Sequence, residues 1–417
     1  MHSHAIPQQM PGRTEFIALV AMLFATIAFS IDGMLPALPA MAEQFSPDAP
    51  NRAQFVVTSF VLGMGIGTLF TGPLSDALGR KPVVLGGAAL YIAGSFLAAM
   101  AQSLEMLLLA RLLQGLGAAG PRVVALAIIR DLFAGRGMAQ IMSFVMMVFT
   151  IVPALAPSIG AGLIALWGWR AVFGAFILFS AISALWLALR LPETLPEEQR
   201  RPFRLALIRD AAREMAAHPM VRLSIVTQGL CFGMLFTMIS TVQPIYDQAF
   251  GRADSFPMWF GIVAILAASG SFVNARLVMR LGMRRLVSRM LLAQTGLSAV
   301  MVLLTLSGLS GDPLFAAFVT WQVSVFFQAG LTLGNLNALG MEPMGHIAGL
   351  AASIIGGVAT VVAVVLALPV SLAFDGTPLS TAVAILVYAV LGVGLSRRMA
   401  RLEREGTGSA PITPAAP

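Results

Sequence analysis

The sequence contains very little cysteine, histidine and charge, and each shortage excludes a class of protein. Cys231 is the only cysteine, so no disulfide can form within the chain. One cysteine and four scattered histidines provide no cluster of metal ligands. No glycine-rich phosphate-binding loop ending in lysine is present, which argues against ATP as an energy source. We therefore expect no metal, no cofactor and no enzyme active site.

The low content of charged residues indicates what surrounds this protein. Charged residues make up 11% of the 417 residues, and hydrophobic residues make up 58%. A soluble protein carries about 25% charged residues, so most of the surface must face lipid. The formal net charge is +7, but the positions of the basic residues indicate membrane orientation, not a nucleic-acid partner.

Long apolar runs predict an all-α integral membrane protein. A hydrocarbon core of roughly 30 Å requires about 20 apolar residues per helix. Twelve runs reach that length: 16–38, 54–74, 82–101, 105–128, 138–163, 169–189, 221–245, 257–279, 287–309, 313–335, 347–370 and 379–396. Because the number of spans is even, both termini are expected on one side.

The basic residues predict which side that is. With a cytoplasmic N-terminus, 21 of the 26 lysines and arginines lie on cytoplasmic segments, and only Arg52, Arg170 and Arg252 lie outside. Arg111 and Arg122 lie within the fourth span. This bias follows the positive-inside rule, so we predict a multi-pass protein of the bacterial inner membrane with both termini in the cytoplasm.

One long loop divides the chain into two halves of six helices. The predicted domains are residues 1–190 (N-terminal half), 191–220 (cytoplasmic linker), 221–396 (C-terminal half) and 397–417 (cytoplasmic tail). Apolar and basic residues alternate at helical period over 201–215. This segment is either an amphipathic helix at the cytoplasmic leaflet or a solvated linker helix.

The two halves repeat each other. Residues 275–284 match residues 72–81 at an offset of 203, with Gly282 on Gly79 and Met279 in place of Asp76. Two related halves of six helices are how many transporters build a central site with alternating access.

Asp32 is the one acid that lies well inside a predicted span. Ionisable residues are costly in a bilayer and are functional hypotheses by default. Pro36 and Pro39 follow closely and break the backbone ladder, which suits the wall of a cavity. Asp32 is therefore the candidate proton carrier.

Arg111, about seven residues from the outer end of its helix, matches Asp32 in depth. The two groups could pair or exchange a proton. Burial favours the neutral acid, whereas Arg111 or a cationic ligand favours the carboxylate, so the protonation of Asp32 can change with conformation. The alternative is a static buried ion pair that locks two helices together.

Several further side chains are candidates for the wall of a substrate cavity. Arg122 either lines the cavity and favours anionic or polar groups, or it snorkels or pairs with a backbone carbonyl. The other candidates combine amide groups with adaptable apolar ones: Gln114, Met146, Gln228, Phe232, Phe236 and Trp321. Helix packing or lipid contact is the alternative for each.

The motifs resemble those of the major facilitator superfamily. Residues 72–81 match its loop between helices 2 and 3 at Gly72, Leu74, Asp76, Gly79, Arg80 and Lys81. Arg111, Gln114 and Gly115 resemble the arginine motif of proton-coupled members, and residues 153–162 resemble the antiporter motif. The strings 32–39, 129–133 and 191–195 are similar to those of Bcr/CflA-type drug-resistance exporters.

The resemblance implies a cytoplasmic gate made of Gly72, Asp76, Gly79, Arg80, Lys81 and Asp131. Arg80 is expected to reach Asp131, and Asp76 is expected to face the N-terminus of a helix in the other half. This cluster would hold the cytoplasmic side shut. Because Met279 replaces the acid in the second half, the latch is expected on one side only.

The resemblance also implies proton-driven efflux of small amphipathic drugs such as phenicols or bicyclomycin-like compounds. Some relatives carry a second membrane acid where this chain has Phe24, and Arg122 is unusual for the pattern. Both departures favour neutral or zwitterionic substrates. The partners are then a small substrate, protons and the lipid bilayer, and the functional unit is a monomer. The alternatives are a metabolite or siderophore transporter of the same fold, and a non-transporting membrane sensor.

Overall fold

The computed structural model describes residues 11–133 and 135–407. The side chains of residues 135, 136, 139, 143, 146, 148–150 and 404–407 fall outside this description. The described chain is mostly helical and contains no strand, and its long connection, residues 191–204, holds a single 3-10 turn, Glu197–Gln199.

Twelve long helices form the body of the described chain. Those of the first half are α1 (Arg13–Asp32), α3 (Phe55–Leu78), α4 (Arg80–Ala99), α5 (Leu104–Leu132), α6 (Gly135–Trp167) and α7 (Arg170–Arg190). Those of the second half are α9 (Pro219–Pro244), α10 (Phe256–Leu281), α11 (Met283–Leu306), α12 (Gly311–Met341), α13 (Ala348–Leu372) and α14 (Leu379–Thr407). The shorter elements include α2 (Leu38–Phe45), η2 (Pro50–Gln54), α8 (Leu205–Ala217), η4 (Ile245–Ala249) and η5 (Glu342–Ile347).

The membrane-spanning character of these helices follows from their length and composition. Ten segments of the described chain are long and apolar enough to cross a bilayer, and one of them runs through α12, η5 and α13. The end of α6, Ile151–Trp167, forms a shorter apolar helix. With α12 and α13 counted separately and α6 included, the segments correspond to the twelve predicted spans. The all-α membrane fold of two six-helix halves is confirmed.

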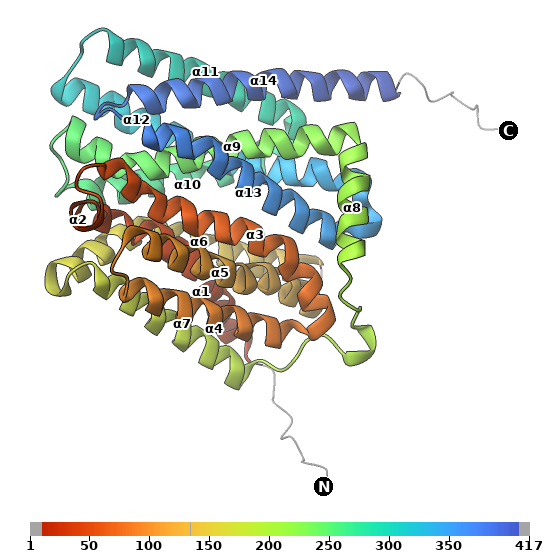
Figure 1. Cartoon of the computed structure of the whole chain (residues 1–417). Helices are drawn as coiled ribbons and strands as arrows, with labels where there is room; N and C mark the ends of the chain where they lie inside the picture. Colours follow the sequence, from red (N-terminus) through yellow and green to blue (C-terminus); the bar gives the residue numbers. More distant parts are fainter. Residues whose placement is uncertain (1–10, 134, 408–417) are drawn as a thin grey trace.

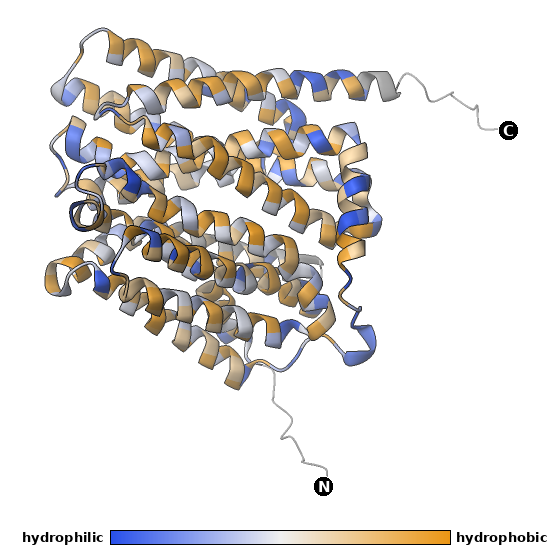
Figure 2. Cartoon of the chain, in the orientation of Figure 1, coloured by the Kyte–Doolittle hydropathy of each residue, from blue (hydrophilic) through white to orange (hydrophobic). Residues whose placement is uncertain are grey.

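The two halves lie one above the other in Figure 1, and α8 runs along one edge of both. We call the end of the bundle next to α8 the linker end, and the opposite end, which carries α2, the far end. Figure 2 shows hydrophobic residues along the helices and hydrophilic residues gathered at the two ends and on α8. This is the pattern of a protein whose middle zone is solvated by lipid.

The first predicted span ends earlier than the apolar pattern indicates. The sequence predicts one helix over 16–38, but α1 ends at Asp32 and a short 3-10 turn, Leu35–Ala37, leads into α2. Pro36 and Pro39 lie in the first turns of the two elements that follow α1. Proline cannot donate a hydrogen bond within a helix but fits its first turn. Asp32 therefore lies at a break in the backbone.

Glycines bring α3 and α5 into close contact. A Cβ atom added to Gly115 would lie 2.0 Å from the carbonyl oxygen of Phe60, and one added to Gly63 would lie 2.1 Å from that of Leu112. Small residues of this kind allow helix backbones to approach in membranes. The Arg111 segment of α5 is thereby fixed against α3.

Gly115→Ala is expected to destabilise the protein strongly. The added methyl group meets backbone atoms that cannot rotate away, so α3 and α5 must separate at a cost of about 1–3 kcal/mol. Thermal unfolding in detergent measures the loss. Gly86→Ala on α4 is the matched control, because its added Cβ has no described atom within 4 Å. Equal melting temperatures for the two variants would contradict the close approach.

Candidate functional site

Asp32 is a buried carboxylic acid with no polar partner among the described residues. Its residue is 6% exposed, and its carboxyl group forms no hydrogen bond or ion pair with the part of the chain that the structure describes. The backbone beside it is closely packed, since a Cβ on Gly160 of α6 would lie 2.2 Å from the carbonyl oxygen of Gly33. A buried ionised carboxylate without a partner is costly, so Asp32 is a candidate functional group.

Arg111 is fully buried and donates to three acceptors on three helices. Its Nε lies 3.0 Å from the carbonyl oxygen of Val56, and its NH2 lies 3.1 Å from that of Ser30. Its NH1 lies 2.6 Å from Oε1 of Gln114. The guanidinium carbon also lies 4.4 Å from the centre of the Phe60 ring, within the range of a cation–π interaction.

Arg111 and Asp32 are not paired in this conformation. Arg111 contacts α1 at Ser30, and residues two apart in a helix point to nearly opposite faces. Asp32 therefore points away from the face that Arg111 contacts. A direct pair was predicted because Asp32 and Arg111 lie at similar depths in their predicted spans. Depth alone does not determine the rotation of α1 about its own axis. The static ion pair is thus absent, and the functional roles of both residues stay predictions.

A buried polar network continues from Arg111 to α4. Nε2 of Gln114 donates to Oγ of Ser95 at 2.7 Å. The hydroxyl groups of Ser30 and Tyr91 lie 2.5 Å apart. Both residues of this last pair are buried, so the network joins α1, α4 and α5.

The linker end of the first half carries an ion cluster centred on Arg80. Its Nε lies 2.8 Å from Oδ2 of Asp131, and its NH1 lies 2.6 Å from Oδ1 of Asp76. The contact between Arg80 and Asp131 that the resemblance implies is confirmed. Asp76 accepts from Arg80 and forms no hydrogen bond with the second half among the described residues. Gly79 has a φ of 102°, a conformation that favours glycine.

Glu193 completes this cluster, although no role was predicted for it from the sequence. Its Oε1 accepts from the backbone N–H of Arg80 at 2.8 Å, and its Oε2 accepts from that of Lys81 at 3.0 Å. Both N–H groups lie in the first turn of α4, where a helix offers them no carbonyl acceptor of its own. The side chain of Lys81 donates to the carbonyl oxygen of Ala188. The motif at residues 191–195 could have indicated this role, since it contains an acid and an acid can cap a helix.

The second half has an ion cluster of its own at the linker end. Arg284 lies 3.3 Å from Glu342 and also pairs with Glu403. Met279, which replaces the acid of the first half, is 88% exposed. The two halves are thus both charged at this end, although the residues that carry the charge differ.

Gly72 places the predicted gate beside the second half. A Cβ on Gly72 of α3 would lie 2.7 Å from Oγ of Ser353 on α13. Farther along the same pair of helices, a Cβ on Gly65 would lie 3.1 Å from Thr360. The two halves therefore meet closely from the linker end to the middle of α3 and α13.

The predicted cavity residues fall into different environments. Gln228 is 4% exposed and its Oε1 has no hydrogen-bond partner within the described chain. On the same helix, Phe232 and Phe236 stack with ring centres 5.8 Å apart. Trp321 donates to Ser298 and packs on Phe318 inside the second half. Gln114 belongs to the Arg111 network.

The structure gives few contacts for the remaining two candidates for the cavity wall. Arg122 has its NH1 3.9 Å from the sulfur of Met64 and no ion pair among the described residues. The side chain of Met146 lies outside the described residues. The cavity roles of both residues stay predictions.

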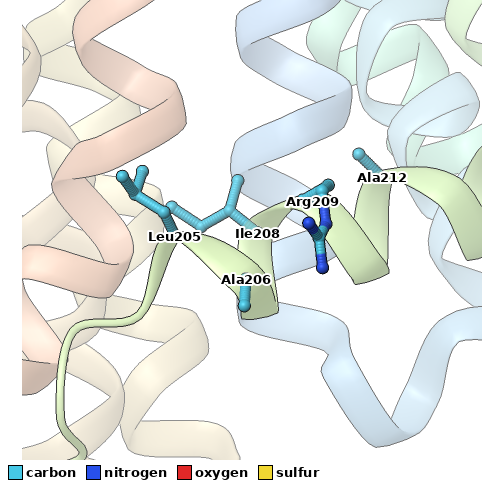
Figure 3. A pocket seen from close by; sticks show the side chains of 5 residues that line it. All are labelled: Leu205, Ala206, Ile208, Arg209 and Ala212. Carbon is cyan, nitrogen blue, oxygen red and sulfur yellow. The ribbon is translucent and has the colours of Figure 1, made fainter.

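The linker helix α8 rests on the second half through its C-terminal part. Ala211 and Met215 are buried against Ile355 and neighbouring residues of α9 and α13. Glu214 pairs with His346 of η5 at 2.9 Å. Figure 3 shows a shallow hollow along the N-terminal part of α8, lined by Leu205, Ala206, Ile208, Arg209 and Ala212. Leu205 is 63% exposed, so the apolar side of α8 is only partly covered.

Asn51 joins the two halves at the far end. Its Nδ2 donates to the carbonyl oxygens of Phe374, at 2.7 Å, and Leu372, at 3.3 Å. Leu372 is the last residue of α13, and the carbonyls of a final helical turn have no partner within the helix. One side chain of the first half thus caps a helix of the second half.

Asn51→Ala is expected to open the far end more often. Two hydrogen bonds are worth about 1–2 kcal/mol net, so the population with an open far end should rise roughly five- to thirty-fold. Distances between spin labels on the far ends of the two halves measure this change. Asn51→Asp removes the amide donor with little change in shape and should act in the same direction. We call the contact of Asn51 with the carbonyl groups of Leu372 and Phe374 the Asn51 latch. Unchanged distances in both variants would contradict its role in holding the far end closed.

Comparison with known proteins gives a consistent similarity over most of the chain. The sequence pattern of the Major Facilitator Superfamily matches residues 18–367. The bicyclomycin resistance protein homolog of Haemophilus influenzae is 29% identical over 347 residues, covering 82% of this chain and 85% of that protein. The chloramphenicol resistance protein of Pseudomonas aeruginosa is 38% identical over 170 residues, or 40% of each chain. The crystal structure of a D-xylose-proton symporter superposes with a TM-score of 0.75 at 14% identity, covering 92% of this chain and 97% of that one.

Proposed function

The chain belongs to the major facilitator superfamily, and we propose that it exports small amphipathic drugs across the bacterial inner membrane in exchange for protons. The linker end then faces the cytoplasm and the far end faces outwards, as the distribution of basic residues favours. One chain contains both halves of the transporter, so a monomer is the functional unit.

The environment of Asp32 carries the proposal of proton coupling. An acid that is 6% exposed and has no polar partner in the described chain is costly in a bilayer unless it is neutral or functional. The break in the backbone after Asp32 lets the end of α1 move without disturbing a continuous helix. Protonation from outside and deprotonation towards the cytoplasm would thus be linked to the movement of this segment.

Arg111 and its network have a positioning role in this scheme. Arg111 holds α1 through the Ser30 carbonyl at 3.1 Å and leaves Asp32 on the other side of the helix. A change in the position of α1 would bring the carboxylate closer to the guanidinium group, whose charge favours the ionised acid. The proton would then leave in the conformation in which the two charges approach.

The chemistry of α9 supports an amphipathic substrate. Phe232 and Phe236 provide a stacked aromatic surface, and Gln228 provides a buried oxygen that receives no donor from the described residues. A substrate with an aromatic ring and a hydroxyl or amide N–H group would satisfy both. The names of the Haemophilus and Pseudomonas relatives indicate bicyclomycin and chloramphenicol resistance, which agrees with this class. Phe24, where an acid would add charge, favours neutral or zwitterionic drugs.

The cluster around Arg80 is proposed as one part of the cytoplasmic gate. It fixes the short connection between α3 and α4 to the end of α5 through Asp131. The rigid base so formed moves with the first half as one body. Gly72 gives this base a close approach to α13, and opening there would release the cytoplasmic side.

A susceptibility and transport panel tests the proposal. An efflux-deficient bacterial host expressing this chain should become more resistant to chloramphenicol or bicyclomycin, and a proton uncoupler should remove the effect. The same host carrying the Asp32→Asn variant is the control for expression without coupling. No change across several drug classes would favour a metabolite transporter of the same fold. Failure of the purified protein to move any solute in liposomes would contradict transport.

A further inference from the structure

A hollow of about 320 Å³ lies at the far end, between the two halves. The first half contributes residues of α2 and η2, among them Glu43, Asn51 and Gln54. The second half contributes residues at the end of α9 and in η4, among them Gln243 and Asp247. The hollow is therefore next to the Asn51 latch, and anything bound in it contacts both halves.

The lining of the hollow is rich in hydrogen-bond acceptors. Glu43 and Asp247 place one carboxylate on each half, and neither forms an ion pair with the described chain. Gln54 is 3% exposed, and its buried Oε1 has no hydrogen-bond partner in the part of the chain that the structure describes. A buried acceptor of this kind is costly unless a donor reaches it. Two carboxylates and this amide oxygen together match a positively charged ligand with N–H donors.

The surrounding surface has an excess of negative charge. The far end carries seven acids, namely Glu43, Asp48, Glu105, Asp247, Asp254, Asp312 and Asp375, and three arginines, namely Arg52, Arg170 and Arg252. Arg52 pairs with Glu105 and Arg252 pairs with Asp312. Arg170 stacks on Trp169 and donates to carbonyl groups. The protein's own cations are thus engaged elsewhere, and the field at the hollow attracts external cations.

We propose that this hollow binds a small organic polyamine from the outer side and that the bound amine bridges the two halves. One ammonium group would lie beside Glu43, another beside Asp247, and an N–H group would reach the oxygen of Gln54. A metal ion fits less well, because the residues that line the hollow include only two carboxylates, on opposite halves, whereas hard cations take six or more oxygen ligands.

Occupation of the hollow would hold the far end closed. The residues that line the hollow lie close together only while the two halves meet at Asn51. A ligand bound in the hollow therefore shifts the population towards the conformation with a closed far end. Polyamine from the outside would then slow the transport cycle. This consequence rests on the proposed function, whereas the binding itself does not.

Spermidine binding to the purified full-length protein in lipid nanodiscs tests the site. Isothermal titration should show saturable binding to wild type. Glu43→Gln and Asp247→Asn should each weaken it by about three- to five-fold, and the double variant by roughly ten-fold or more, as partly exposed ion pairs allow. Asp254→Asn is the matched control: it removes the same charge from an exposed loop of the same end without touching the hollow.

Two outcomes would overturn the proposal. One is binding that Asp254→Asn weakens as much as Asp247→Asn does, since that result indicates only the general surface charge. The other is saturable binding that neither lining variant changes. The regulatory step is tested separately in liposomes, where spermidine outside should slow drug transport by wild type and not by the double variant. Binding without any transport would leave the site standing and contradict the proposed function.

Discussion

Asp32→Asn is expected to abolish drug efflux driven by a proton gradient while leaving the fold intact. Asparagine has almost the same shape as a protonated aspartic acid, and Asp32 has no partner in the described chain that the change would disrupt. The variant should therefore reach the membrane in normal amounts and melt at a similar temperature. It cannot release a proton, so concentrative transport should fall to background in liposomes with an imposed pH gradient.

The exchange of substrate without net proton movement separates coupling from binding. Asp32→Asn should still exchange labelled drug for unlabelled drug across liposomes, because the neutral side chain imitates the protonated state. Asp32→Glu retains the titratable group and should keep part of the concentrative activity. Full concentrative efflux by Asp32→Asn would contradict the role of this acid. Loss of folding in both variants would instead indicate a structural role.

Replacement of Arg111 is expected to have the largest effect on stability and transport together. Arg111→Ala leaves two backbone carbonyls and the Gln114 oxygen without a donor in a buried site. Hydrogen bonds to charged groups are worth about 1.5–3 kcal/mol each, so the free energy of unfolding should fall by about 3 kcal/mol or more. Thermal unfolding in detergent and drug transport in liposomes are the two measurements.

Arg111→Lys tests the geometry of the contact. Lysine keeps the charge but cannot donate to three acceptors in the planar arrangement of a guanidinium group. It should retain part of the stability and lose most of the coupled transport. Arg122→Ala is the matched control on the same helix, since Arg122 forms no ion pair in the described chain. Equal loss of stability from Arg111→Ala and Arg122→Ala would contradict the special position of Arg111.

The sequence predicted the membrane fold well because lipid imposes a strong and simple constraint. Each span needs about 20 apolar residues, and the twelve runs correspond to the twelve long helices. The contact between Arg80 and Asp131 also follows from the resemblance of residues 72–81. The early end of α1 could be anticipated only in part: the prolines signal a break, but the apolar run continues past it.

The details of the site depend on helix rotation, which the sequence does not determine. Arg111 reaches the Ser30 carbonyl instead of the Asp32 carboxylate because α1 turns that face towards α5. Backbone acceptors leave no mark on the sequence, so Val56 was not identifiable. Glu193 caps α4 from more than 100 residues away, a contact that only the folded chain brings together. The sequence did not indicate the contact of Asn51 with the end of α13 for the same reason.

Release of protons when drug binds to the purified protein tests the role of Asp32 most directly. The protein is held in weakly buffered detergent solution at a pH at which wild type is protonated, and a pH-sensitive dye follows the addition of chloramphenicol or bicyclomycin. Wild type should release protons, and Asp32→Asn should bind the drug and release none. Equal release by both proteins would place the proton on another group and contradict the assignment of Asp32 as the proton carrier.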